Sequence, residues 1–233
     1  MILQLVRAKR RRILVDINTQ RDFLLADGNA CIRNHRRVLS HIRRMMAWAR
    51  INNVPVISIA AVYPDTNSEL TTGYCIDGTE GQKKIRYTLL NNRISFPADG
   101  STDLPRDILR QYRQIILHKR SVDPFKEPRI DRLLSEVRAN EFILIGACAE
   151  DAVLETALGL LQRDKTVTVV ADAVGSHDKK QSKLALRKIE AKGAKLVETK
   201  KLAGTSRLRH VGACDCKMCR GHASKTSATI EAA

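Results

Sequence analysis

The stretch EFILIGACAEDAVLETALGLLQR, residues 141–163, combines the two patterns that decide the fold. Residues 141–146 form a short and almost continuously apolar run, which is typical of a strand covered on both faces. Residues 151–163 have the length and the apolar spacing of a helix with one buried face. A buried strand that leads directly into such a helix is the repeating unit of a parallel sheet.

The same alternation extends along the chain in both directions. Strand-like runs rich in Val and Ile lie at 13–17, 54–60, 114–118, 166–170 and 194–198, and helix candidates lie at 34–52, 103–111, 128–139 and 178–191. Right-handed crossovers place such helices on both faces of the sheet. The sequence therefore predicts an α/β fold, a Rossmann-like three-layer α/β/α sandwich with a mostly parallel sheet of six strands. Residues 61–102 are irregular and are expected to form a long loop insertion.

The chain divides into three segments by composition and charge. A basic N-terminal arm (1–12) precedes the α/β domain (13–202), and a basic tail (203–233) follows it. The formal net charge is +16, of which residues 1–12 carry +5 and residues 201–233 carry +4. Basic ends of this kind bind polyanions by releasing condensed counterions, so nucleic acid is one candidate partner. The alternative is that these charges only keep the chain soluble.

The tail contains a compact group of metal-ligand residues. Three thiols and one imidazole, a complete set for tetrahedral zinc, come from Cys214, Cys216, Cys219 and His222. The alternative is a flexible tail whose free thiols are prone to oxidation. Zinc in the tail is therefore one hypothesis, and no cofactor is expected for the core domain.

Bulk features argue against a membrane or secreted protein. No run approaches the roughly 18 apolar residues that a membrane span requires. The start MILQLVRAKRRR places its basic residues after the apolar stretch, which is the wrong order for a secretory signal. Six cysteines without such a signal indicate reduced thiols or metal ligands. A cytoplasmic location is expected.

Five motifs occur in order along the chain, four of them at the ends of expected strands and one, GTEG, in the loop insertion. They are VDINTQRDF (15–23), GTEG (78–81), KRSVDPF (119–125), GACAEDAVLETA (146–157) and VADA (170–173). With these motifs, residues 13–202 resemble the isochorismatase-like cysteine hydrolases, a family that includes nicotinamidases and related amidohydrolases.

The resemblance implies a catalytic group of Asp, Lys and Cys, and two of the three positions are substituted. The Asp position of the D-x-Q-x-D-F motif is Asn18, the Lys position is Lys119, and the Cys position is Ala152. The resemblance also assigns substrate contacts to the remaining motif positions: Gln20, Asp22, Phe23 and Ala149, the last of which replaces the family's Thr.

These substitutions remove the two groups that perform the chemistry. Ala152 has only a methyl group, so no covalent intermediate can form there. Asn18 retains the shape of Asp but cannot accept a proton near neutral pH. The chain is therefore expected to be catalytically silent or strongly impaired, and to bind a small molecule at the former active site.

The alternative is a working hydrolase of C–N bonds in a small amide, and whether the chain is an enzyme stays open. Such an enzyme would use Lys119 with Asp16, which lies two residues before Asn18 and on the same side of a strand. Cys148 is a further thiol, but a small buried apolar role is the simpler interpretation.

Two further implications of the resemblance concern metal and assembly. Nicotinamidases of the family bind a divalent metal through an Asp and several His residues after the second strand. Residues 58–65 contain no His, so that site is expected to be absent. Family members are commonly dimers or tetramers, so a homo-oligomer is expected.

Overall fold

The computed structural model describes residues 12–65 and 73–205, and it contains one parallel sheet. The strand order is β3-β4-β2-β1-β5-β6-β7, and every pairing is parallel. The strands are β1 (Arg12–Ile17), β2 (Val56–Ala61), β3 (Arg93–Phe96), β4 (Gln114–Lys119), β5 (Glu141–Gly146), β6 (Val167–Val174) and β7 (Lys195–Val197).

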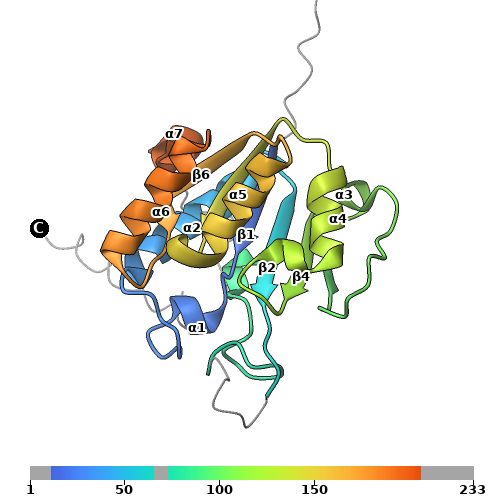
Figure 1. Cartoon of the computed structure of the whole chain (residues 1–233), viewed down its shortest axis with the longest axis horizontal. Coiled ribbons are helices and arrows are strands. Elements are labelled where there is room, and N and C mark those ends of the chain that lie inside the picture. Colours follow the sequence, from blue (N-terminus) through green and yellow to red (C-terminus); the bar gives the residue numbers. More distant parts are fainter. Residues whose placement is uncertain (1–11, 66–72, 206–233) are drawn as a thin grey trace, which may run out of the picture.

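Helices cover both faces of this sheet, which gives three layers (Figure 1). One apolar cluster joins the sheet to α3 (Ile108–Gln111), α4 (Pro128–Glu136), α5 (Leu154–Gln162) and α6 (Lys179–Ala191). The other joins the opposite face to α1 (Arg21–Leu24), α2 (His35–Ile51) and α7 (Thr199–Ala203). Three short helical segments complete the domain: η1 (Arg86–Thr88), η2 (Pro124–Lys126) and η3 (Ala149–Val153).

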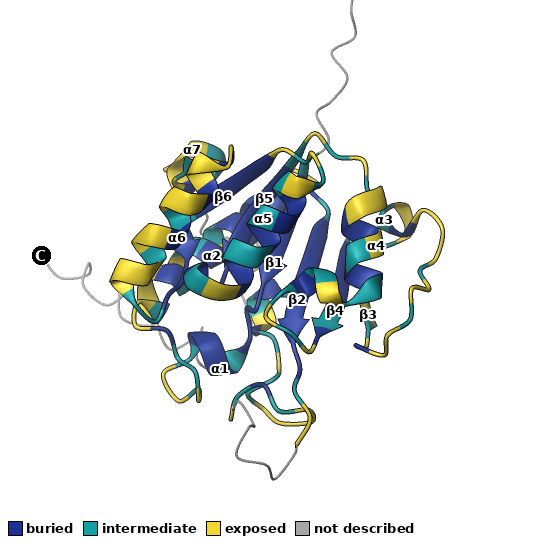
Figure 2. Ribbon diagram, in the orientation of Figure 1, coloured by how far each residue is buried: buried dark blue, intermediate teal, exposed yellow. Residues whose placement is uncertain are grey.

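The residue patterns explain these layers. Along β1, Ile13, Val15 and Ile17 pack into one apolar cluster and Leu14 into the other, as the alternation of side chains across a strand requires. The five central strands are therefore mostly buried on both faces, whereas the edge strands β3 and β7 are partly exposed and the helices are exposed on their outer sides (Figure 2). In α2 the side chains of Val38, Ile42, Met45, Met46 and Ala49 are buried at helical spacing, so they form one apolar stripe.

The predicted α/β fold with a parallel sheet is confirmed, with two local differences. The sheet has seven strands, because β3 forms inside the region expected to be a loop. This strand has only four residues and alternates between exposed and half-buried positions, so it has no apolar run to reveal it. The helix expected at 103–111 is helical only at 108–111.

Because all strands are parallel, the sheet has two chemically different edges. The strands end beside α1 at the lower edge of the view in Figure 1, and they begin at the opposite edge. Ligands of such sheets bind beyond the carboxyl ends of the strands. Within residues 12–65 and 73–205, no helix is long and apolar enough to cross a membrane.

Candidate active site

The three predicted catalytic positions all lie at the carboxyl edge of the sheet. Asn18 follows β1, Lys119 ends β4, and Ala152 lies between the end of β5 and the start of α5. The strand register aligns Ile17 with Gly146. It also aligns Ala61 with Lys119, so β2 separates the Lys119 strand from the Asn18 strand.

Asn18 occupies a left-handed backbone conformation directly after β1. Its φ is +48°, a value that Asn and Asp tolerate better than most residues. Its backbone N–H donates to the Ile59 carbonyl at 2.8 Å, which holds the turn against β2. The residue is 4% exposed, and its Oδ1 has no hydrogen-bond partner among the described residues. The site therefore contains a buried acceptor that a ligand could satisfy.

A glycine brings the end of β5 close to the end of β1. Gly146 has a φ of +124°, and a Cβ atom at this position would lie 1.9 Å from the Ile17 carbonyl oxygen. The next N–H, that of Ala147, donates to the same carbonyl at 2.9 Å. Only glycine permits this approach, which places the segment 147–153 beside Asn18.

Ala152, the predicted nucleophile position, lies in η3, immediately before α5. Ala152 is 1% exposed, and its carbonyl accepts a hydrogen bond from Thr156 Oγ1 at 2.5 Å. Its methyl group belongs to the apolar cluster that underlies α4 and α5. The side chain at this position is therefore core packing and has no reactive atom.

Lys119 is a fully buried lysine without a close carboxylate partner in the described part of the chain. It is 1% exposed, and its Nζ donates to the Ser121 carbonyl at 2.6 Å. Burial lowers the pKa of this amine to about 8, and negative charge on Cys75, Asp123 and Asp151 would partly oppose that shift. At neutral pH the amine is mostly protonated and can still donate hydrogen bonds to a ligand.

The Asp16 carboxylate bonds to Ser58 and Lys84 and has no contact with Lys119 that the structure describes. Its Oδ2 accepts from Ser58 Oγ and from Lys84 Nζ, each at 2.8 Å, and the Asp16–Lys84 ion pair is almost completely buried. Along β1, Asp16 shares its face with Leu14, which belongs to the cluster covered by α2. The carboxylates whose charges act on Lys119 are those of Asp123 and Asp151.

Two thiols lie in the electrostatic environment of Lys119, and both are strongly protonated. Cys75 is 0% exposed and Cys148 is 2% exposed. Burial raises the pKa of Cys75 to about 12, and it raises the pKa of Cys148 as well. The nearby Lys119 charge opposes these shifts without reversing them. Because the thiolate is the reactive form, these raised pKa values make both thiols weak nucleophiles near neutral pH.

The predicted substrate-binding residues make extensive contacts within the domain. The Gln20 side chain donates to the carbonyls of Ala61 and Gln82 and accepts from the Ala61 N–H, so it joins β2 to the insertion. Asp22 accepts from the backbone N–H of Cys75 at 2.6 Å and of Asn29 at 3.1 Å.

Phe23 and Ala149 are the other two residues predicted to bind substrate. Phe23 packs edge-on against Tyr74, with ring centroids 5.2 Å apart. Ala149 is 0% exposed, and its N–H donates to the Gly175 carbonyl at 2.8 Å. Gln20, Asp22 and Phe23 therefore hold the insertion against the carboxyl edge, whatever further contact they make with a ligand.

Several residues near this edge were not predicted from the sequence. Cys75, whose charge acts on Lys119, comes from the region expected to be a loop, and the rings of Tyr63 and Tyr74 from the same region pack edge-on at 5.5 Å. Asp151 is exposed, yet loss of water around its carboxyl raises its pKa, and the charge of Glu150 adds to this effect. Its position directly before Ala152 was the only sequence signal for Asp151.

The two metal hypotheses concern different parts of the chain. In the described ranges, no group of three or more His, Cys, Asp or Glu side chains could hold a metal ion. Cys214, Cys216, Cys219 and His222 lie outside the described residues. The tail therefore stays a zinc hypothesis.

A three-layer sandwich around a parallel sheet, with polar side chains at the carboxyl ends of its strands, defines the chain as an α/β protein. The chain belongs to the isochorismatase family, whose Isochorismatase domain model matches residues 12–201. It is 22% identical over 184 residues to the uncharacterized isochorismatase family protein YaaI of Bacillus subtilis (strain 168), covering 79% of this chain and 90% of that protein.

Solved structures share the fold at low sequence identity. The pyrazinamidase/nicotinamidase of Streptococcus mutans UA159 is 20% identical with a TM-score of 0.64, and the match covers 80% of this chain and 99% of that one. The MAR1 ribonuclease of Caenorhabditis elegans is 22% identical with a TM-score of 0.57, and the match covers 84% of this chain and 81% of that one. At these identities the likeness shows the fold alone.

Proposed function

We propose that this chain is a catalytically silent isochorismatase-family protein that binds a small carbonyl-containing or anionic ligand at the former active site. The observation that carries the proposal is the buried methyl group of Ala152 at the position of the family's thiol. No covalent intermediate can form on a methyl group.

The local thiols and carboxylates support the same interpretation. Cys75 and Cys148 are held as neutral thiols by burial, so they do not replace the missing nucleophile. Asp16 is engaged by Lys84 and Ser58, so it does not replace the missing base at Asn18. Loss of either group costs several orders of magnitude in the rate of a cysteine hydrolase, and the two losses are not additive.

The remaining polar groups suit binding. Lys119 has N–H groups beyond the one that bonds to Ser121, and Asn18 Oδ1 is an unsatisfied acceptor. A ligand with a carbonyl or carboxylate oxygen for Lys119 and an N–H or O–H group for Asn18 would satisfy both. Small carboxamides and hydroxy acids have this combination.

The test is a restoration of the family's catalytic group in the full chain. Hydrolysis of a panel of small primary amides is measured by ammonia release for the natural chain, for Ala152→Cys, for Asn18→Asp, and for both changes together. Asp at position 18 should tolerate the left-handed backbone as Asn does. We expect activity only in the doubly changed chain, at least ~10³-fold above either single variant, because the two groups act as a unit.

One control makes this result interpretable. Lys119→Ala in the doubly changed chain should abolish the new activity, which would assign it to the site described above. The proposal is wrong if the natural chain hydrolyses an amide as fast as the doubly changed chain does.

The alternative of an active C–N hydrolase has one structural observation in its favour. Asp151 is an exposed carboxyl whose charge acts on Lys119, and its raised pKa suits proton transfer better than that of an ordinary surface Asp. If the natural chain is active, Asp151→Asn should abolish the activity. Asp16→Asn tests the carboxyl that the sequence favoured for the same role.

A second candidate function, favoured by the net charge of +16, is polyanion binding through the basic termini. Removal of residues 1–11 and 203–233 should then abolish a salt-sensitive shift with nucleic acid. For the tail, one zinc per purified chain that is lost in Cys216→Ser/Cys219→Ser would support zinc binding, and metal-free natural protein would end that hypothesis. Light scattering would test the proposed homo-oligomer.

A further inference from the structure

Four acidic side chains act electrostatically on the candidate active site, and Asp151 is the one whose carboxylate has no partner in the described part of the chain. Asp22, Asp123 and Glu150 each accept hydrogen bonds from backbone N–H groups. Asp151 is exposed, and no hydrogen bond or ion pair with a described residue involves its carboxylate. This carboxylate is therefore available to a cationic group of a ligand.

The backbone places Asp151 at the carboxyl end of β5. Its N–H donates to the carbonyl of Cys148, two residues after that strand, at 3.2 Å. Gly146 brings this end of β5 against the end of β1, where Asn18 Oδ1 is a buried acceptor without a partner among the described residues. The charge of Asp151 also acts on the Lys119 amine, so a ligand a few atoms long can contact both groups. A carboxylate, an unpaired acceptor and an ammonium group thus share one site.

Two half-buried tyrosines border the same carboxylate. Tyr63 lies two residues after β2, and its ring packs edge-on against that of Tyr74 with centroids 5.5 Å apart. Burial raises the pKa of both hydroxyls, and the negative charge of Asp151 contributes to the rise. Aromatic rings attract ammonium groups through their negative faces. Rings and carboxylate together suit a cation.

These side chains do not form a metal site. The family resemblance places the metal ligands of nicotinamidases after the second strand, but residues 58–65 contain no His, and in the described ranges no three metal-ligating side chains lie together. Tyr63 lies in that segment instead. Divalent metals prefer carboxylate and imidazole ligands, whereas aromatic rings attract alkylammonium groups. The cation that fits here is therefore an organic one.

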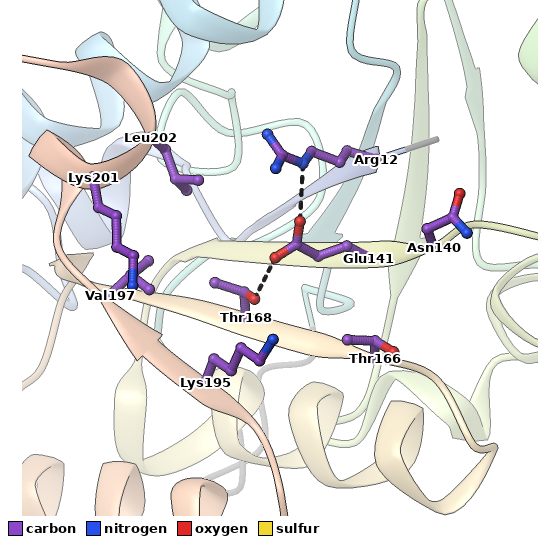
Figure 3. Close-up of a pocket in the computed structure, with 9 residues that line it drawn as sticks. All are labelled: Arg12, Asn140, Glu141, Thr166, Thr168, Lys195, Val197, Lys201 and Leu202. Atoms are coloured by element: carbon purple, nitrogen blue, oxygen red, sulfur yellow. Dashed lines mark hydrogen bonds and ion pairs between the residues drawn. The ribbon is translucent and has the colours of Figure 1, made fainter. Parts of the chain in front are cut away.

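The amino edge of the sheet has the opposite balance of charge. A groove of about 540 Å³ forms there where β1, β5 and β6 begin, together with β7 and α7 (Figure 3). Its charged lining residues are Arg12, Glu141, Lys195 and Lys201. At the carboxyl edge, by contrast, the segments 147–153 and 175–178 contain three acidic residues and no Lys or Arg. Although the chain carries +16, an ammonium group is therefore attracted to the carboxyl edge.

We propose that the ligand of the candidate active site is a small amino acid, whose carboxylate binds Lys119 and whose ammonium group binds Asn18 Oδ1 and the Asp151 carboxylate. Each charge of such a ligand meets an opposite charge, and the unpaired acceptor receives an N–H group. A hydroxy acid or a neutral amide would make no use of Asp151. The inference rests on the proposed function, because it requires a ligand at the former active site.

The test compares matched compounds that differ only in an ammonium group against a methyl group. The pairs are glycine with propionate, β-alanine with butyrate, and γ-aminobutyrate with pentanoate. Their three lengths cover a range of separations between the two charges. Dissociation constants for the natural full chain are measured by ligand-observed NMR at pH 7 in 100 mM KCl.

We expect at least one amino acid to bind ~10-fold or more tightly than its methyl isostere, because a charge-assisted hydrogen bond replaces an apolar contact. Asp151→Asn should remove most of this preference and leave the affinity of the isostere unchanged. The residue is exposed, so the variant should fold normally.

Two control variants remove charges from the amino edge. Asp164 is an exposed residue between α5 and β6 with a φ of +55°, which Asn tolerates, so Asp164→Asn is matched to Asp151→Asn. Lys195→Gln/Lys201→Gln removes two exposed cations of the groove. Neither variant should change the affinity of any of the six compounds.

Equal affinities within all three pairs would overturn this inference and leave the proposed function intact, because a carboxylate alone would then suffice for binding. A preference that survives Asp151→Asn, or that Lys195→Gln/Lys201→Gln removes, would also overturn it. So would the absence of binding by all six compounds at 20 mM. The proposed function fails by a different measurement, namely amide hydrolysis by the natural chain.

Discussion

The two edges of the sheet hold lysines in opposite states. At the carboxyl edge, Lys119 is 1% exposed and donates to a backbone carbonyl, and burial lowers its pKa to about 8. At the amino edge, Lys195 and Lys201 are exposed and unpaired among the described residues. Water explains the difference, because a buried ammonium loses its hydration and a surface one keeps it.

This contrast shows how one residue type supports two kinds of recognition. A buried lysine acts at short range, so its use depends on its neighbours, and in the proposed silent site Ala152 and Asn18 stand at the nucleophile and base positions. Exposed lysines act at longer range, so their use depends mainly on how many charges of one sign gather together.

The largest expected effect tests the buried ion pair beneath the carboxyl edge. Lys84→Met leaves the fully buried Asp16 carboxylate without its cation and should lower the free energy of unfolding by about 3–5 kcal/mol. Urea denaturation at pH 7 would measure this. Asp16→Asn/Lys84→Met removes both charges and should recover much of the loss. A loss below ~1 kcal/mol in Lys84→Met would mean that water solvates Asp16.

The second effect tests whether Lys119 is buried as described. Its folded pKa of about 8 lies below the unfolded value of about 10.4, so the unfolded chain binds more protons between these values. The stability of the natural chain should therefore rise, relative to Lys119→Met, as the pH increases from 8 to 10.5. The rise should be at most about 3 kcal/mol. Below pH 8 the destabilisation is fully present and constant.

Urea midpoints of the two chains across this pH range provide the measurement. Comparison with Lys119→Met removes the contribution of the thiols, whose raised pKa values act in the opposite direction above pH 9. Parallel curves for the two chains would indicate that the amine is solvated.

The smallest effect concerns the amino edge. Glu141→Gln removes the carboxylate that pairs with Arg12, and stability should fall by less than ~1 kcal/mol because this pair is partly exposed. Urea denaturation at pH 7 would measure the change. A loss above ~2 kcal/mol would show that the pair is shielded from water.

The sequence predicted the layers of the fold because burial produces a pattern that can be read directly. Five of the seven strands are apolar runs covered on both faces, and these five and the short edge strand β7 were found within a few residues of their bounds. β3 was missed since an exposed edge strand with alternating polar residues resembles a loop.

The site was only partly predictable, because sequence spacing does not reveal side-chain partners. The motif positions predicted that Asn18, Lys119 and Ala152 lie at one edge of the sheet. They could not reveal that Lys84 binds Asp16, or that Cys75 lies in the electrostatic environment of Lys119, since both contacts come from the irregular insertion. The amino-edge groove had no motif, because it joins residues that are far apart in the chain.

The most direct test of the central claim is ammonia release from small primary amides by the natural full chain and by Lys119→Ala. The catalytically silent site predicts the same rate for both chains, equal to the rate in buffer alone. Hydrolysis by the natural chain that Lys119→Ala abolishes would contradict it, because the carboxyl edge would then perform chemistry without the family's thiol and carboxylate.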